Sequence, residues 1–356
     1  MNKILFIISD FEGGGTQKVI SLLANYLVKK EFKIKICIIN QSKTMYKLSE
    51  KIEKINLGVK KNNTKLCFIF KNLKRLFLLR QTLKIHREYI LLSFLTTTNI
   101  LCLLSSVGLN FNIIINERND VLKQKLKFSW KILKFLTYKF ADKMTTNNKS
   151  NFKFLKKKYG AIVIYLSNPI KVKKFTKIKK EKIILSVGRL HYQKNYFQIL
   201  RCFKVFTLKN NNWVYYILGE GELKKRIQQY INFLDLKEKV KIFNFTNPSP
   251  FYKKASILVH GAKYEGTPNV LLEAMSYGLP IISSNYIGSS DIIKNNYNGI
   301  IYQTESDKDL VEKMTNLSSS LNLRKKLSKN GLTFAKKFDV SIVSKEWINL
   351  FKQLKK

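Results

Sequence analysis

Two glutamates bracket a turn that is rich in helix-breaking residues. Glu265 and Glu273 have seven residues between them, and this interval opens with Gly266, Thr267, Pro268, Asn269 and Val270. The turn followed by an apolar run predicts a helix that begins near Asn269, whose free backbone N–H groups form an anion site. Carboxylates beside such a site suit the hydroxyls of a sugar or ribose attached to the anion. Taken alone, the turn is equally typical of an ordinary helix N-terminus with acidic neighbours.

Two cations lie where a predicted strand passes into the next helix. Arg189 and Lys194 follow the apolar run 182–187, and Gly188 lies between that run and Arg189. Ligands of α/β proteins bind at the carboxyl ends of strands. There the two cations would neutralise a diphosphate, arginine through its planar fork and lysine as a point charge. Gly219, at the end of another predicted strand, is a weaker candidate for the same site.

The first half of the chain offers a glycine-rich loop and one further arginine. Gly13, Gly14 and Gly15 follow the first apolar run and let the backbone approach a phosphate or sugar closely. The spacing of a dinucleotide-binding loop, G-x-G-x-x-G, is absent. Arg118 ends another apolar run, where it either meets an acceptor phosphate or forms an interdomain salt bridge, and the sequence leaves both open.

The sequence predicts neither a metal site nor a redox site. The triplet Asp307-Lys308-Asp309 lies at an apparent helix start, where acidic residues cap a helix. The three histidines show no metal-ligand spacing. The cysteines lie far apart in apolar surroundings, which predicts reduced core thiols in a cytoplasmic protein. They are Cys37, Cys67, Cys102 and Cys202.

Two series of apolar runs and helical patterns must position these residues. The alternation predicts parallel sheets with right-handed crossovers, and hence an α/β protein with two doubly wound, Rossmann-like domains facing a cleft. The predicted domains are 1–167 and 168–335, with a C-terminal helical segment at 336–356 that packs back toward the first domain. The predicted strands are 3–9, 33–39, 90–94, 113–116, 142–146, 182–189, 213–218, 240–243, 257–259 and 279–283, and a helix is predicted at 195–207.

Residues 89–116 carry no charge and are numerous enough to span a bilayer. Polar residues interrupt the stretch at 96–99 and again at 105–112. Buried parallel strands are continuously apolar. We therefore predict a strand, a turn, a buried helix at about 100–107 and a second strand, and we expect no signal peptide at the N-terminus.

The formal net charge of +43 indicates attraction to polyanions. The lysines are spread along the chain, and no zinc-finger, RNP-like or helix-turn-helix signature predicts specific nucleic-acid binding. Residues 71–86 and 123–143 are basic amphipathic candidates, and Leu126, Trp130, Leu133 and Leu136 fall near one face of the second. Such helices either pack on a core or lie in a membrane interface. Two of them, with this charge, favour peripheral contact with an anionic membrane.

In this order the motifs resemble those of the retaining glycosyltransferases of family 4, which have the GT-B fold. The resemblance is close over residues 182–303 and looser over the N-terminal half. The Glu265 and Glu273 pair, in the setting Glu-Gly-Thr-Pro-Asn-Val-Leu-Leu-Glu-Ala, matches the signature carboxylates of that family. Ser-Val-Gly-Arg-Leu with Lys194 matches its diphosphate motif, and Asn168-Pro169 matches its interdomain crossing.

The resemblance implies a role for each of these residues. Glu273 would bind the ribose and Glu265 the transferred sugar. Arg189, Lys194 and the amides of 266–270 would hold the diphosphate without a metal. The glycine loop would lie near phosphate and acceptor. Where many relatives carry a histidine near the acceptor, this chain has Glu-Arg-Asn at 117–119.

The resemblance also implies a function. We expect retaining transfer of a hexose or N-acetylhexosamine, with UDP as the expected carrier, to a glycan or polyprenyl-diphosphate-linked saccharide. The products would be bacterial surface polysaccharide, lipopolysaccharide or glycoprotein glycan, made on the inner face of the cell membrane. The alternative is a non-catalytic protein that binds nucleotide sugars or polyanions. An NAD-dependent epimerase is disfavoured because the dinucleotide fingerprint is absent.

Overall fold

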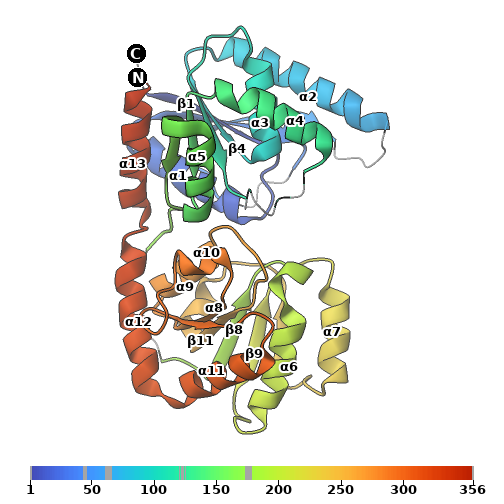
Figure 1. The fold of residues 1–356 in the computed structure, drawn as a ribbon, viewed down its shortest axis with the longest axis vertical. Coiled ribbons are helices and arrows are strands. Elements are labelled where there is room, and N and C mark those ends of the chain that lie inside the picture. The colour runs from blue at the N-terminus through green and yellow to red at the C-terminus, as the bar shows by residue number, and fades with distance from the viewer. Residues whose placement is uncertain are drawn as a thin grey trace. The chain divides into compact units, whose positions relative to one another are not determined.

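The computed structural model divides the chain into two compact units (Figure 1). Unit 1 comprises Met1–Pro169 with Val340–Lys356, and unit 2 comprises Ile170–Asp339. From the sequence we predicted that the chain passes from the first domain to the second between residues 167 and 168, and that a separate C-terminal segment begins at residue 336. The structure describes residues 2–42, 46–60, 66–119, 121, 124, 126–172 and 179–354.

Unit 1 is built on a seven-stranded parallel sheet in the order β3-β2-β1-β4-β5-β6-β7. The central strands β1, β4 and β5 are buried almost throughout, because helices cover both faces of the sheet and apolar side chains leave water on both. The strand order reverses between β1 and β4. The strands are β1 (Lys3–Ile8), β2 (Lys33–Asn40), β3 (Glu53–Val59), β4 (Ile90–Phe94), β5 (Ile113–Glu117), β6 (Lys143–Thr146) and β7 (Val163–Tyr165).

Helices from both ends of the chain cover the sheet of unit 1. On one face, side chains of α1 and α13 share a core with the sheet, and Trp347 of α13 is 2% exposed. On the other face lie α2, α3 and α4 (Figure 1), and their side chains Leu79, Ile100 and Trp130 belong to one buried cluster. The helices are α1 (Gly15–Lys29), α2 (Leu66–Ile85), α3 (Thr96–Ser106), α4 (Phe128–Thr137), α5 (Lys149–Tyr159) and α13 (Val340–Gln353).

The uncharged stretch at 89–116 folds as predicted, into β4, α3 and β5. In the part of the chain that the structure describes, no helix combines the length and the hydropathy needed to cross a membrane. The single helix predicted at 123–143 is wrong, because α4 ends at Thr137, a 3₁₀ turn follows at Tyr138–Phe140, and β6 begins at Lys143. Lys123 and Lys125 lie outside the described residues.

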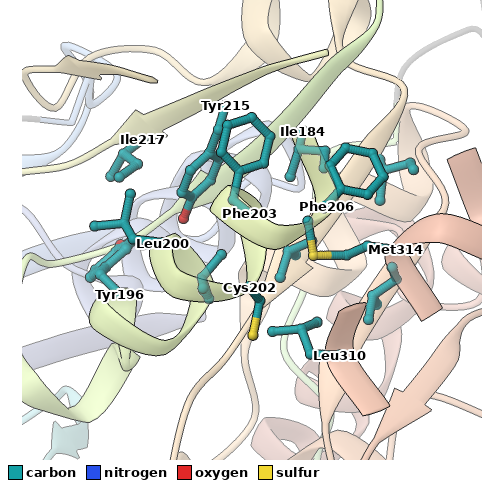
Figure 2. Packing of buried hydrophobic residues seen from close by; sticks show 14 of the residues in the cluster. Ile184, Tyr196, Leu200, Cys202, Phe203, Phe206, Tyr215, Ile217, Leu310 and Met314 are labelled. Carbon is teal, nitrogen blue, oxygen red and sulfur yellow. The ribbon is translucent and has the colours of Figure 1, made fainter. Parts of the chain in front are cut away.

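Unit 2 holds a six-stranded parallel sheet in the order β10-β9-β8-β11-β12-β13, which reverses between β8 and β11. Phe203 and Phe206 of α6 pack with Tyr215 and with Leu310 of α11 on one face (Figure 2). The strands are β8 (Ile183–Val187), β9 (Val214–Leu218), β10 (Val240–Phe243), β11 (Ile257–His260), β12 (Ile281–Ser284) and β13 (Ile300–Tyr302). The helices are α6 (Tyr196–Thr207), α7 (Lys224–Phe233), α8 (Ser249–Lys254), α9 (Asn269–Ser276), α10 (Ile287–Ser290), α11 (Asp307–Ser319) and α12 (Leu321–Lys336).

The acidic triplet begins a helix, which confirms the capping interpretation. Asp307 and Asp309 lie in the first turn of α11, and the Ser306 side chain accepts a hydrogen bond from the Asp309 N–H. Among the described residues, no group of three or more His, Cys, Asp and Glu side chains is arranged to hold a metal ion. Cys37, Cys102 and Cys202 are buried free thiols, as predicted, and Cys67 lies in a stretch of α2 whose side chains the structure does not describe.

Candidate active site

Glu265 forms the centre of a polar cluster at the carboxyl edge of the unit 2 sheet. One carboxylate oxygen, Oε2, lies 2.7 Å from Nζ of Lys194 and 2.9 Å from Nε2 of His260. These partners follow β8 and end β11, the neighbouring strands between which the strand order reverses. The other oxygen, Oε1, receives no hydrogen bond from the described residues. That oxygen is therefore placed to accept one from a ligand hydroxyl.

The charges of the cluster are fixed by its partners. Burial alone would raise the pKa of Glu265, but the Lys194 ammonium and the His260 hydrogen bond outweigh it and hold the pKa far below its usual range. Burial, and then the Lys194 charge, lower the pKa of His260 although Glu265 opposes this. His260 is therefore neutral near pH 7. Because a carboxylate only accepts, Nε2 of His260 carries the proton that it donates to Glu265.

Lys194 is positioned by a network that ties two loops together. It ends a 3₁₀ turn at Tyr192–Lys194, and its side chain is 10% exposed. Gln193 accepts a backbone hydrogen bond from Lys263 and donates one from its side chain to the Tyr264 carbonyl, while the hydroxyls of Tyr192 and Tyr264 pair with each other. The loop after β8 and the loop after β11 are thus held at a fixed spacing around the ion pair.

Arg189 and two glycines form the neighbouring surface. Arg189 is exposed and forms no ion pair with any described residue. A hydrogen bond with Tyr192 and, to a smaller extent, burial raise the pKa of Tyr264. The positive charge of Arg189 opposes this rise, so the guanidinium lies close enough to affect the charge of the loop that precedes Glu265. Gly188 and Gly219 lie in contact, since a Cβ on Gly219 would lie 1.9 Å from the Gly188 carbonyl oxygen. Only glycine fits at position 219.

The predicted helix start after Glu265 is confirmed. Helix α9 begins at Asn269, and its N-cap residue, Pro268, makes no side-chain capping hydrogen bond. Gly266, Thr267 and Pro268 form the turn that precedes it, and Val270 follows within the first turn of the helix. Glu273 lies one turn further on, where the Tyr252 hydroxyl donates to its Oε2 over 3.4 Å. The structure thus brings both glutamates into one segment of unit 2, and their roles toward a ligand remain predictions.

Two features of this site were not predicted from the sequence. His260 carried no motif, and only its position at the end of the apolar run 257–259 could have indicated it. Gly288 of α10 packs against the Glu265 loop, where a Cβ would lie 1.7 Å from the Gly266 carbonyl oxygen and 2.6 Å from that of Glu265. Gly288 therefore fixes the backbone that carries Glu265, and no local pattern reveals a contact between segments so far apart in the chain.

The remaining predicted residues lie in unit 1. The Gly13–Gly15 loop ends at α1, and the Tyr46 hydroxyl accepts a hydrogen bond from the Gly14 N–H at 3.2 Å and donates one to the Gly14 carbonyl at 3.0 Å. Arg118 is 8% exposed, and burial lowers its pKa to about 9. It donates to Asn168, an amide of the same unit. Within unit 1 no described carboxylate pairs with it, and both the interdomain salt bridge and the phosphate contact stay predictions.

Glu117, next to Arg118, has a structural role. Its side chain is fully buried, accepts from Thr96 Oγ1 at 2.9 Å and from the Tyr138 hydroxyl, and lies 3.1 Å from Lys134 Nζ. The carboxylate therefore joins α3, α4 and the 3₁₀ turn to β5. Both of its oxygens are engaged by these partners, so neither is free for acceptor chemistry.

Two doubly wound parallel sheets in one chain are the architecture of the GT-B class of α/β proteins, and here the second sheet carries an ionised carboxylate, a lysine and a neutral histidine near its switch point. Residues 167–334 match the model of the family described as glycosyl transferases group 1. An uncharacterized glycosyltransferase of Methanocaldococcus jannaschii is 30% identical, and the alignment covers 83% of this chain and 87% of that relative. The chain therefore belongs to the group 1 glycosyltransferases.

Two further comparisons extend over nearly the whole chain. A Campylobacter jejuni enzyme is 29% identical over 100% of this chain and 99% of its own length; it is an α-1,4-N-acetyl-D-galactosaminyltransferase that acts on GalNAc-α-(1→4)-GalNAc-α-(1→3)-diNAcBac-PP-undecaprenol. A crystal structure of S. aureus TarM with UDP, α-GlcNAc-glycerol and fondaparinux superimposes with a TM-score of 0.81 at 14% identity, covering 99% of this chain and 100% of that one. The second likeness concerns the fold alone.

Proposed function

We propose that this glycosyltransferase moves a hexose or N-acetylhexosamine from a UDP-sugar to a lipid-linked saccharide, with retention of anomeric configuration as in family 4. The observation that carries the proposal is the Lys194–Glu265–His260 cluster in the segment that leads into the N-terminal end of α9. The named activity of the Campylobacter relative supports a polyprenyl-diphosphate acceptor, and UDP in the TarM crystal supports a uridine donor. Synthesis of a bacterial surface glycan or glycoprotein glycan is the corresponding process.

The proposed site stabilises a leaving diphosphate. When the bond from the anomeric carbon to the diphosphate breaks, negative charge grows on the phosphate oxygens, and preorganised positive groups lower that barrier. Lys194, Arg189 and the N–H groups at the start of α9 supply this charge without a metal. Oε1 of Glu265 accepts from a hydroxyl of the transferred sugar, and Glu273 from the ribose.

Lys194 and His260 are the side chains that contact the Glu265 carboxylate in the described part of the chain, so no second carboxylate stands beside it as a covalent nucleophile. We therefore propose a front-face reaction, in which the acceptor oxygen bonds to the anomeric carbon on the side that the diphosphate leaves. The acceptor proton passes to an oxygen of the departing phosphate. Neutral His260 keeps Glu265 ionised and oriented in this scheme, and it takes no proton from the acceptor.

A panel of UDP- and GDP-sugars, assayed for binding, hydrolysis and transfer with EDTA present, tests the donor assignment. We expect turnover with one UDP-sugar, undiminished by EDTA. Glu273→Ala should raise the donor KM roughly 10- to 100-fold, because it removes a charged hydrogen-bond acceptor. Glu312→Ala, which removes an exposed glutamate of α11 in the same unit, is the matched control and should change little. Binding of no nucleotide sugar at all would overturn the catalytic assignment in favour of a polyanion-binding protein.

We also propose that unit 1 contacts an anionic membrane surface, through a face of α4 and the following 3₁₀ turn that shares only Leu136 with the face that the sequence indicated. Trp130 and Leu133 pack in the core of unit 1, so they do not present an outer face to a membrane. A second set of apolar side chains is exposed, between 44% and 78%, amid exposed lysines at 127, 131 and 139. Apolar side chains ringed by cations suit the boundary between acyl chains and acidic headgroups. The set is Phe128, Ile132, Phe135, Leu136 and Phe140.

Flotation of the protein with vesicles tests the membrane surface. We expect binding to vesicles that contain phosphatidylglycerol and none to pure phosphatidylcholine. The double change Phe135→Ser with Phe140→Ser should weaken binding at least about tenfold, because two aromatic side chains no longer enter the interface. Phe233→Ser, at an 80% exposed phenylalanine of unit 2, is the control. Equal loss in both variants, or no flotation of the wild type, would contradict the assignment.

A further inference from the structure

Unit 1 contains a cavity of about 230 Å³ that no part of the proposed donor chemistry uses. Ser9 lies just beyond β1, Asn40 ends β2, and both line the cavity together with residues of α2, α3 and α4. Its walls therefore meet at the carboxyl ends of β1 and β2 and beside α3, which follows β4. The strand order of unit 1 reverses between β1 and β4, and doubly wound proteins bind ligands at such a point.

Among the described residues that line this cavity, one side chain is charged, a cation whose described partners are all neutral. Arg75 of α2 donates from Nε and Nη2 to Oδ1 of Asn40, at 3.2 and 2.9 Å, and from Nη1 to Oδ1 of Asn72 at 2.8 Å. Within the described part of the chain no carboxylate pairs with it. The two amides thus hold the guanidinium in place and leave its charge, and two of its five N–H groups, for another acceptor.

The start of α3 adds a second positive element to the cavity. Helix α3 begins at Thr96 without a side-chain cap, so its first N–H groups carry the partial positive charge of the helix dipole. Thr97 and Thr98 of this first turn line the cavity. Thr98 is 1% exposed, and its hydroxyl has no hydrogen-bond partner among the residues that the structure describes. A buried hydroxyl in that state costs free energy, and an acceptor group in the cavity would relieve it.

The size and remaining walls of the cavity limit what it can hold. At roughly 30 Å³ per water molecule, its volume corresponds to about eight waters, which is room for one phosphate or one sugar ring. Trp130 and Leu101 add apolar side chains to the lining. The cavity therefore suits a ligand that combines negative charge with an apolar part.

We propose that this cavity binds a phosphate group of the acceptor, held by Arg75, the first turn of α3 and the Thr98 hydroxyl. The assignment of this phosphate to the acceptor rests on the proposed function, whereas the phosphate site itself does not. The same chemistry is present in a prenyl diphosphate and in a sugar phosphate. The two sources are distinguished by whether the apolar side chain of Trp130 contributes to binding.

The test is a titration of the full chain with inorganic phosphate, in which ³¹P NMR measures the binding. About 0.3 M KCl screens the non-specific attraction of phosphate to so basic a protein. We expect Arg75→Met to weaken phosphate binding roughly 10- to 100-fold, and Thr98→Val to weaken it roughly 2- to 10-fold. Thr98→Val should leave the midpoint of urea unfolding unchanged or higher, because it removes a hydroxyl without a partner. The matched control is Arg80→Met on the same helix, whose guanidinium donates to the carbonyls of Ser105 and Val107.

Two comparisons keep this site separate from the donor site. Phosphate binding that survives Lys194→Met but not Arg75→Met belongs to the cavity, whether or not any nucleotide sugar is turned over. Farnesyl diphosphate and glucose 1-phosphate then serve as the two acceptor probes, and a loss of the first alone in Trp130→Ala identifies the prenyl diphosphate. Equal loss of phosphate binding in Arg75→Met and Arg80→Met, or none in either, would overturn the proposal.

Discussion

Lys194→Met is expected to lower turnover about 10²- to 10³-fold with the fold intact, since loss of one preorganised positive donor has effects of that size. The ammonium is 2.7 Å from Glu265 and is held by the network between the two loops, so water cannot take its place in the same geometry. Measurement of kcat with saturating donor separates this loss from weaker binding. Turnover within threefold of the wild type would contradict the assignment.

The same substitution has a readout that does not depend on turnover. The Lys194 charge is one of the groups that lower the pKa of His260, so this pKa should rise in Lys194→Met when it is followed by NMR. The depressed pKa of Glu265 stabilises the folded protein above the unfolded value of about 4.3, and that stability is lost as the pH falls below it. Urea unfolding should therefore depend less on pH between about 3 and 5 in the variant.

Lys263→Met is the matched control for Lys194→Met. Lys263 lies two residues before Glu265 and pairs with Glu305 at 2.8 Å, and the side chains are 39% and 67% exposed. Solvent screens such a pair, so its loss should change stability by less than about 1 kcal/mol and leave kcat unchanged. A fall in kcat comparable to that of Lys194→Met would mean that any charge change near this loop acts on turnover.

Gly288→Ala should lower kcat/KM about 10²-fold, although it adds only one methyl group and removes no charged side chain of the site. The new Cβ would lie 1.7 Å from the Gly266 carbonyl oxygen, so the backbone that carries Glu265 must move. A displacement of about 1 Å in a reacting geometry costs roughly that factor. The rate should be measured together with the midpoint of thermal unfolding, so that misplacement of the loop is distinguished from unfolding.

Gly108→Ala is the control for Gly288→Ala, because it introduces backbone strain without a steric clash. Gly108 has φ +72°, and nothing lies within 4 Å of the position that its Cβ would take. The change should cost about 1–2 kcal/mol of stability, from the left-handed backbone alone, and leave activity unchanged. If Gly288→Ala lost only as much activity as Gly108→Ala, general destabilisation would explain both variants.

The sequence predicted those elements whose signal is local. The strands β1, β4, β5, β8 and β11 are fully or almost fully buried, so each appears as an uninterrupted apolar run. The edge strand β3 was missed because its sequence mixes polar residues and a glycine and only its last residue is buried. Strands β7 and β13 were missed because they are three residues long. The start of α9 was predicted correctly because proline and glycine act within a few residues.

The candidate site could be predicted only where a residue type and a strand end coincide. Glu265 and Lys194 met that condition, and the structure joins them. His260 and Gly288 matter because of contacts made across the sheet, which no neighbouring residue in the sequence encodes. The outer face of α4 was misassigned for a related reason: Trp130 and Phe128 are both apolar, and only the packing of α2 and α3 decides which of them is buried.

The discontinuity of unit 1 has a consequence for the order in which the chain matures. Its core includes Val343, Trp347, Leu350 and Phe351 from the last helix, whereas unit 2 is one continuous stretch. During synthesis, which proceeds from the N-terminus, the chain of unit 2 is complete before unit 1 has received its final core residues. A nascent or truncated chain that stops before α13 exposes the apolar face of α1 and β1, and it presents that surface to chaperones and proteases. Chaperones and proteases can therefore distinguish a chain that has received α13 from one that has not by whether the apolar face of α1 and β1 is covered.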